Sequence, residues 1–582
     1  MRFNERMRWL TRHSLPLFFL GFFIFLVGNN TVDWDVFRTG LEVESQSWTL
    51  EHRPPIWSYQ YCGGAPRAGD PQAFGLSPFI LLSLLFGSFW GSKLIYWFCS
   101  VVGFVYSRRL FALFFRSGTD PSPPLSEDSL TALVLLYVFS SFFLWHGAQG
   151  HLTFALMYFG MAIIYYTFKA RVGEFERSDY LPSILLTWAF YSAGLYAGLV
   201  YLLLPFFFAQ GLDICFVEPL RLKVRGQKWR IDIHGKRIFQ AVTFHLAGMI
   251  AGGYKLYYVI AYQHEFPRTV PDTFVIGHWW DSFFYQLLPM MGARFLGHFK
   301  SLFGTPSGGE EAFNLFAWVL VIYLFFRFGR RNRRPVESHR EKSSDLDAFL
   351  WVYGITLLLF ALGKSYPWTP HAILAHYIFH DSIRVVQRYQ IGVTLWLALV
   401  TIRVLAHDSS FREWLVPQRL AWLVVIAGLN FFTFRGAMFS NWDIRPYLRV
   451  AEEGTREMQS LEATDTGDDH PEMNFMWNIT RSGRAVLNCY DPMIRDEYAN
   501  RYIADEWEQR RIHFPIELPF VAPEINSPSG ECRQRSYFTQ NRIYIDPSCP
   551  KVTCVNLNAI NPFDPHPGVS FNPRLGKLCT GT

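Results

Sequence analysis

The sequence predicts an all-α polytopic membrane protein with about eleven transmembrane helices and a small extracytoplasmic α+β domain at the C-terminus. Three observations lead to this fold class. Half of the 582 residues are hydrophobic, the hydrophobic residues gather in long runs, and basic residues cluster between alternate runs. Only 18% of the residues are charged, whereas soluble proteins have roughly 25%. The mean hydropathy is only +0.10, because polar outer segments dilute the apolar ones.

The apolar runs give the positions of the membrane spans. The first run follows four arginines and lacks a small-residue cleavage site, so we interpret it as a helix and not as a cleaved signal. A shorter apolar run, residues 76–87, is expected to form a re-entrant or interfacial helix before the second span. Spans are expected at residues 15–28, 93–107, 130–145, 152–168, 181–209 (two short helices with a turn near 194–198), 238–262, 315–328, 348–363, 391–405 and 420–434.

Lysines and arginines near the spans indicate the orientation. With a cytoplasmic N-terminus and eleven spans, every basic cluster between spans falls on the cytoplasmic side. The chain then divides into a transmembrane domain, residues 1–439, and an extracytoplasmic domain, residues 440–582, with short strands expected at 535–558. The outer segments of the transmembrane domain are residues 29–75, 263–312 and 364–390.

Composition also excludes several classes of protein. Hydrophobic content this high rules out a disordered chain, and eight cysteines are few for a disulfide-stabilised miniprotein of this length. The chain has no glycine-rich phosphate loop, which argues against an ATP-driven transporter. The net charge of +6 does not indicate nucleic acid, because much of the basic excess lies in the inner loops. Six cysteines fall outside, where up to three disulfides can form, in a pairing that stays open.

Three carboxylates in the first outer segment are the catalytic candidates. Asp33 and Asp35 follow the first span, and Asp70 lies in a stretch rich in glycine and proline. A carboxylate at the membrane surface can act as a general base toward a hydroxyl group or hold a divalent cation. The alternatives are structural: Asp33 or Asp35 caps a helix, and Asp70 forms a turn.

A late outer segment carries the candidate phosphate-binding residues. Arg384 and Arg388 would share one face of a helix, and two guanidinium groups suit a phosphate or pyrophosphate. Lys364 and His371 add possible hydrogen-bond donors. The alternative is that the arginines extend toward ordinary lipid headgroups. In a separate tight turn, His146 and His151 either contact a ligand or, as we expect, stabilise the turn.

At this point the residues resemble the GT-C superfamily of membrane glycosyltransferases, and within it the bacterial YfhO-type proteins. The resemblance rests on the acidic pair after the first span, on a first-loop string, and on Leu362-Gly363 followed by Arg-x-x-x-Arg-Tyr. The string runs Pro-Ile-Trp57, Cys-Gly-Gly-Ala-Pro, Asp-Pro-Gln and Leu-Ser-Pro-Phe79. In architecture the resemblance covers residues 1–435.

The resemblance implies transfer of a sugar from a polyprenyl-phosphate donor to a glycan, lipid or protein outside the cytoplasmic membrane of a bacterium, with inversion. It assigns the base to Asp35 first and Asp33 second. Donor-phosphate binding falls to Arg384, Arg388, Lys364 and His371, and substrate positioning to Asp70, His151 and Arg67. No cofactor follows with certainty, although some members use a divalent cation. A lipid-linked glycan polymerase or ligase, a lipid-linked glycan transporter (flippase), and a non-catalytic scaffold are the alternatives.

Overall fold

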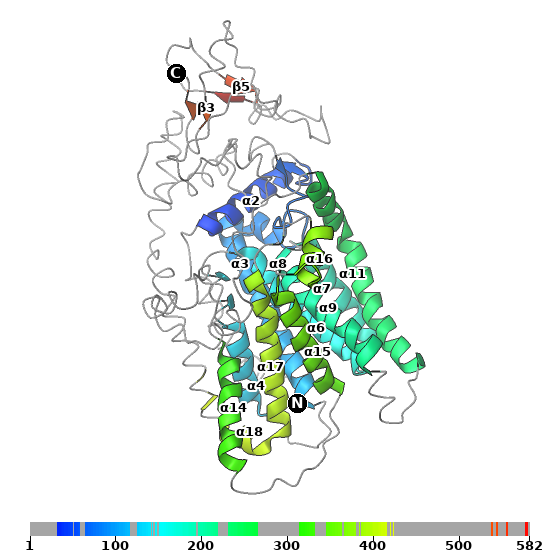
Figure 1. Cartoon of the computed structure of the whole chain (residues 1–582). Helices are drawn as coiled ribbons and strands as arrows, with labels where there is room; N and C mark the ends of the chain where they lie inside the picture. The colour runs from blue at the N-terminus through cyan, green and yellow to red at the C-terminus, as the bar shows by residue number, and fades with distance from the viewer. Residues whose placement is uncertain are drawn as a thin grey trace, which may run out of the picture.

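The computed structural model describes a bundle of helices (Figure 1). Among the residues that the structure describes, four helical stretches are long and apolar enough to cross a membrane: Ile80–Arg116, Leu152–Arg171, Leu199–Val217 and Gln390–His407. The described residues are 32–49, 52–58, 65–116, 125–140, 142–143, 146–147, 151–193, 196–218, 231–265, 314–331, 345–363, 366–379, 383, 386–415, 419–420 and 423, with strand residues 537–538, 543–544, 554–556 and 577–579. The predicted first span lies outside this set, as does almost all of the last, so the count of eleven stays a prediction.

The longer helices occupy the positions that the apolar runs predict. They are α3 (Ile80–Arg116), α4 (Glu127–Val138), α6 (Ala155–Arg171), α7 (Tyr180–Ser192), α9 (Leu204–Leu212), α11 (Ile231–Glu265), α14 (Leu315–Arg331), α15 (Asp345–Ala361) and α17 (Gln390–His407). The shorter helices are α8 (Tyr196–Gly198), α16 (Pro370–Tyr377) and α18 (Ser409–Leu415). Short 3₁₀ segments are η1 (Leu152–Phe154), η2 (Arg177–Asp179) and η5 (Val386–Tyr389), and π-helical turns are η3 (Leu199–Leu203) and η4 (Asp213–Val217).

Two local expectations agree with the described helices. The run at 181–209 forms two passes, because α7 ends at Ser192 and the next helical segment begins at Tyr196. The short run at 76–87 leads into the second span, and Gly87, with a φ of 77°, interrupts α3 between them. A positive φ of this size favours glycine, so Gly87 marks the break.

The first outer segment differs from the expected loop in its first half. Residues Val32–Thr49 form an 18-residue helix, α2, which lies across one end of the bundle (Figure 1). This stretch has no proline and only one glycine, whereas Pro54 and Pro55 follow soon after it. The chain then forms two short antiparallel strands, β1 (Trp57–Ser58) and β2 (Ala65–Pro66).

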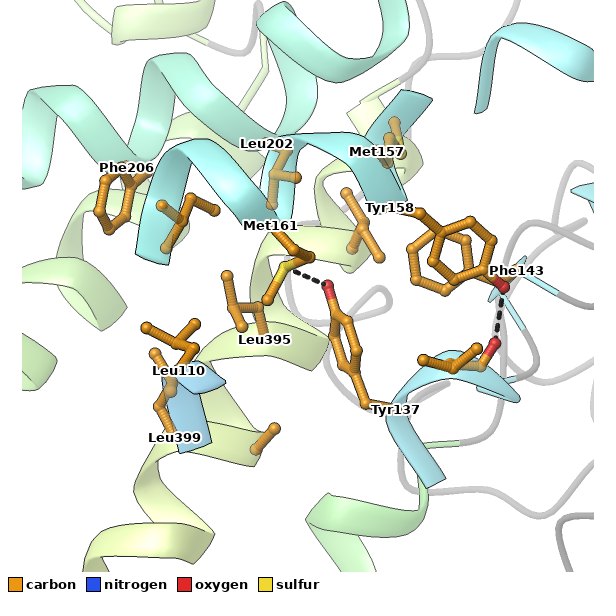
Figure 2. Packing of buried hydrophobic residues seen from close by; sticks show 14 of the residues in the cluster. Leu110, Tyr137, Phe143, Met157, Tyr158, Met161, Leu202, Phe206, Leu395 and Leu399 are labelled. Carbon is orange, nitrogen blue, oxygen red and sulfur yellow. Dashed lines mark hydrogen bonds between the residues drawn. The ribbon is translucent and has the colours of Figure 1, made fainter. Parts of the chain in front are cut away.

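The centre of the bundle is packed with aromatic and aliphatic side chains. Figure 2 shows Tyr137 of α4 donating its hydroxyl to the Met161 sulfur of α6, at 3.2 Å. The Phe143 ring stacks on Tyr158 at 3.7 Å, and the Tyr158 hydroxyl donates to the Val138 carbonyl at 2.6 Å. In a bilayer, close packing and interhelical hydrogen bonds of this kind hold helices together.

The outer face of α11 is apolar and exposed, as expected of a helix that faces lipid. Together with the four long apolar helices, this face indicates a membrane protein. Its exposed large side chains are Ile238, Phe239, Val242, Leu246, Ile250, Tyr257 and Ile260.

The bundle has two ends, which we name after α2 and α18. At the α2 end, the Ser88 hydroxyl of α3 donates to a carboxylate oxygen of Glu42 in α2, at 2.6 Å. At the α18 end, Arg403 of α17 donates to the Phe114 carbonyl of α3 at 3.1 Å and pairs with Asp347 at 2.7 Å. The start of α17 therefore lies at the α2 end. The same holds for the start of α6, because Phe168 near its other end packs on Phe114.

Four strands are described in the C-terminal region: β3 (Tyr537–Phe538), β4 (Ile543–Tyr544), β5 (Cys554–Asn556) and β6 (Lys577–Cys579). They form two antiparallel pairs, and the register of β5 and β6 sets Cys554 opposite Cys579. Directly opposed residues have the backbone spacing that a disulfide needs. The α+β domain as a whole stays a prediction.

Candidate functional site

Glu44 of α2 belongs to a buried group of four charged residues, which we call the Glu44 cluster: Glu44, Arg67, Asp70 and Lys255. One Glu44 oxygen accepts hydrogen bonds from Arg67 Nη2 at 2.7 Å and Nε at 3.2 Å. Arg67 Nη1 pairs with Asp70 at 2.9 Å, and Lys255 of α11 donates to the Asp70 backbone carbonyl. The cluster therefore joins α2, the loop after β2 and α11.

Further hydrogen bonds hold the same loop. The second oxygen of Glu44 accepts from the Phe74 backbone amide at 3.2 Å, and Trp48 Nε1 donates to the Gly75 carbonyl at 2.9 Å. Burial raises the pKa of the Glu44 carboxyl, and the adjacent Arg67 guanidinium opposes that rise. With both oxygens engaged, Glu44 is suited to hold the loop and not to act as a base.

A second pair of buried basic side chains lies where α2 crosses α3. The Arg38 guanidinium lies 4.3 Å from the centre of the Phe89 ring, and Lys93 Nζ lies 5.9 Å from the same ring centre. Asp33 and Asp35 belong to α2 and precede Arg38 by five and three residues. The backbone of both predicted bases is therefore in the helix α2, one to two turns before Arg38.

The third group, which we call the His146 cluster, consists of His146, His151, Phe154, Tyr201 and Arg388. The two histidine Nδ1 atoms are 2.6 Å apart, so one donates to the other. His146 stacks on Phe154 with ring centres 3.7 Å apart. The Arg388 guanidinium lies 4.9 Å from the Phe154 ring centre and 5.9 Å from that of Tyr201. Burial, with the nearby His151 and Arg388, holds the pKa of His146 well below its usual value.

His371 borders this cluster through Tyr389. Its Nδ1 lies 3.0 Å from the Tyr389 hydroxyl, and both side chains are buried. The Tyr389 ring packs on Tyr201 with ring centres 5.1 Å apart. Tyr201 is thus the common neighbour of Arg388 and Tyr389. Of the other predicted residues, His371 contacts Tyr389, and His151 contacts His146 and Phe154.

The other predicted site residues fall into two sets. Arg67 and Asp70 are brought together, as an ion pair within the Glu44 cluster. Arg384 and Lys364 lie outside the described residues, so the shared face of Arg384 and Arg388 stays a prediction. Arg388 itself lies in the 3₁₀ turn η5.

Sequence reasoning did not select Glu44, Lys255, Arg38, Lys93 or Tyr201. One sign was present for Lys255, which is the single charged residue of the apolar run 238–262. A charge within such a run usually has a partner or a function. Glu44 and Tyr201 carry no comparable sign, because their partners are distant in sequence.

The described part of the chain holds no group of three or more histidine, cysteine, aspartate or glutamate side chains placed to bind a metal. What it does bring to the α2 end is an acidic helix, buried cations and a histidine–arginine cluster. Such a set can bind an anionic group and place it near carboxylates.

The fold and these groups define a helical membrane protein with a polar region built at one end. No protein-family model, no curated protein and no solved structure matches the chain.

Proposed function

We propose that the chain transfers a sugar from a polyprenyl-phosphate-linked donor to an extracytoplasmic lipid, glycan or protein, with inversion at the sugar carbon. One observation carries the proposal. The helix that contains Asp33 and Asp35 lies at the same end of the bundle as Arg388, His151 and His371. Residues from opposite ends of the transmembrane sequence are thus available to one reaction site, in line with the GT-C resemblance.

In this proposal Asp35 is the general base, with Asp33 as the second choice. The base removes the acceptor proton while the hydroxyl oxygen attacks the anomeric carbon, and the bond from that carbon to the phosphate oxygen breaks. The electron pair leaves on polyprenyl phosphate, whose negative charge Arg388 stabilises, together with Arg384 and Lys364. A divalent cation held by Asp33 and Asp35 is the alternative source of that stabilisation.

The proposed orientation puts the α2 end outside the cytoplasmic membrane of a bacterium. Residues 440–582 then form the extracytoplasmic domain, and donor, acceptor and membrane lipid are the partners. The basic clusters between spans support this orientation.

The test is transfer by membranes that contain Asp35→Asn or Asp33→Asn and are supplied with labelled polyprenyl-phosphate sugars. Loss of a general base is expected to lower kcat by about 10²–10⁴-fold for Asp35→Asn. Asp128→Asn is the matched control, because Asp128 is an exposed carboxylate in the first turn of α4. If both Asp35→Asn and Asp33→Asn transfer sugar at the rate of the unmodified chain, the assignment of the base is wrong.

A transporter is the second candidate, because the fully buried Lys93 and Lys255 lie within helices, and intramembrane charges are common in transporters. Vesicles that contain a fluorescent lipid-linked glycan separate the two functions. If the purified chain moves that lipid between leaflets but transfers sugar from no supplied donor, including lipid pyrophosphate glycans, the transporter replaces the proposed transferase and ligase activities.

A further inference from the structure

The Arg388 guanidinium lies between side chains from two other parts of the chain. Phe154 comes from η1, at the start of the pass that contains α6. Tyr201 comes from η3, in the next pass that runs from the α2 end to the α18 end. The guanidinium carbon is 4.9 Å from one ring centre and 5.9 Å from the other, and both distances are within the range of a cation–π contact. Both rings are buried, whereas Arg388 is partly exposed.

Both rings are themselves held in place. Phe154 stacks on His146 at an interplanar angle of 8°, and His146 is bonded to His151. Tyr201 packs against Tyr389, the residue next to Arg388. The positions of the two ring faces are therefore fixed by contacts that do not depend on Arg388.

The helix that carries Tyr201 departs from α geometry at that residue. Residues Leu199–Leu203 form a π-helical turn within a pass that is otherwise mainly α-helical. π-Helical turns are rare and occur frequently at functional sites. The second π turn of the same pass, η4, carries Asp213, which pairs with Arg171 at the α18 end. Each π turn thus presents a side chain to an arginine.

Ring faces hold an arginine differently from carboxylates. Arg67, Arg171 and Arg403 are paired with Glu44 and Asp70, with Asp213, and with Asp347. A ring face orients the guanidinium plane by stacking on it.

We infer that Phe154 and Tyr201 form an aromatic seat that positions the Arg388 guanidinium for the phosphate group of the lipid-linked donor. This inference rests on the proposed function and adds two positioning residues to it. The seat aligns the donor phosphate through Arg388, so its removal is expected to weaken phosphate binding more than it slows the chemical step.

The first test measures binding of a labelled polyprenyl phosphate to the full chain in nanodiscs of phosphatidylcholine. Phe154→Leu keeps an apolar side chain but removes the ring, and is expected to weaken binding about tenfold. Phe159→Leu is the matched control, because Phe159 is equally buried in the same pass and packs on Phe79 and Phe98. The control is expected to bind like the unmodified chain.

A second pair of variants keeps the inference testable if Phe154→Leu does not fold. Tyr201→Leu is expected to weaken binding similarly, whereas Tyr201→Phe keeps the ring face and is expected to bind normally. If Phe154→Leu and Tyr201→Leu, both folded, bind polyprenyl phosphate as tightly as the unmodified chain, the aromatic seat is refuted.

Arginine labelling tests the seat apart from the proposed function. Phenylglyoxal modification of Arg388, followed by mass spectrometry, is expected to be faster in Phe154→Leu than in the unmodified chain, and an equal rate overturns the seat.

Polyprenyl phosphate is expected to slow the labelling of the unmodified chain. If it neither binds nor protects Arg388, the proposed function fails, while the labelling comparison still decides the seat. If phosphatidylglycerol or inorganic phosphate protects equally well, the assignment to the lipid-linked donor is overturned.

Discussion

Several charged residues at the α2 end are buried beside groups that balance them. Glu44 is the clearest case, since Arg67, the Phe74 amide and the nearby Lys255 surround its carboxylate. Removing one partner of a buried ion pair leaves an uncompensated charge, which costs more than the pair itself contributes. The Glu44 cluster therefore has a larger effect on stability than its number of bonds suggests.

We expect Glu44→Gln to lower the free energy of unfolding by about 3 kcal/mol, because only Asp70 would then remain to balance the buried Arg67 and Lys255. The measurement is chemical unfolding of the purified chain, followed by tryptophan fluorescence. Glu127→Gln is the control: the Glu127 side chain is 52% exposed where it pairs with Arg108, against 1% for Glu44. The control is expected to cost less than about 1 kcal/mol. Equal losses in the two variants would contradict the assigned role of the buried cluster.

At this scale the sequence identifies residue types better than partners. Arg67 and Asp70 were selected from a first-loop string, and they do contact each other three residues apart. Their other partners are distant in sequence: Glu44 lies 23 residues from Arg67, and Lys255 lies 185 residues from Asp70. Contacts at such separations depend on how the helices pack, which spacing within one segment cannot reveal. The substrate-positioning roles of Arg67, Asp70 and His151 stay predictions.

The position of a single helix depends on its close contacts with neighbouring helices as well as on its hydrophobicity. In α11, Gly252 and Gly253 are neighbours on different sides of the helix. A Cβ atom at Gly252 would lie 2.8 Å from Tyr191 Cβ and 3.2 Å from the Ser192 backbone nitrogen of α7. At Gly253 the same atom would meet nothing within 4 Å. Of these two, Gly252 is the one that the close crossing of α7 and α11 requires, as does Gly248 one turn earlier, where a Cβ atom would clash with Thr187 Cβ.

We expect Gly252→Ala to destabilise the protein by about 1–3 kcal/mol, because the α7 backbone must shift. Gly253→Ala is expected to be neutral or to stabilise by up to about 1 kcal/mol, because alanine favours a helix. Unfolding of both variants under the same conditions measures the difference. If Gly252→Ala is as stable as Gly253→Ala, the close crossing of α7 and α11 is wrong.

Hydropathy predicted the apolar helices because a chain in lipid must satisfy its backbone hydrogen bonds internally. The same approach missed α2, which is polar and contains two aspartates in its first turn. A search for apolar runs passes over such a helix. The absence of proline between residues 32 and 49 was the available sign.

In the described part of the bundle, successive passes alternate between the α2 end and the α18 end. The Glu44 and His146 clusters lie at one end, and the Arg403–Asp347 and Arg171–Asp213 pairs lie at the other. Basic residues between spans predicted this alternation, because they are retained on the cytoplasmic side. The membrane orientation, the count of eleven and the C-terminal domain depend on residues outside the described set, and they stay predictions.

Cysteine labelling of intact cells tests the orientation. Thr49→Cys, at the exposed end of α2, is expected to react with a membrane-impermeant maleimide. Ser178→Cys, in the exposed turn between α6 and α7, is expected to react only after the membrane is permeabilised. Mass spectrometry at each position separates these sites from native cysteines such as the exposed Cys215. The reverse pattern would show that the α2 end is cytoplasmic.

The two π turns also limit how the length of this pass can change. Each residue advances an α-helix by about 100°, and a π turn accommodates one more residue than an α turn. Deleting Leu202 or Leu203 from η3 would rotate the part of the pass that carries Asp213 relative to the part that carries Tyr201. Either Tyr201 would then lose its contact with Arg388, or Asp213 would lose its contact with Arg171. The segment from Leu199 to Val217 therefore tolerates substitution more readily than a change in its number of residues.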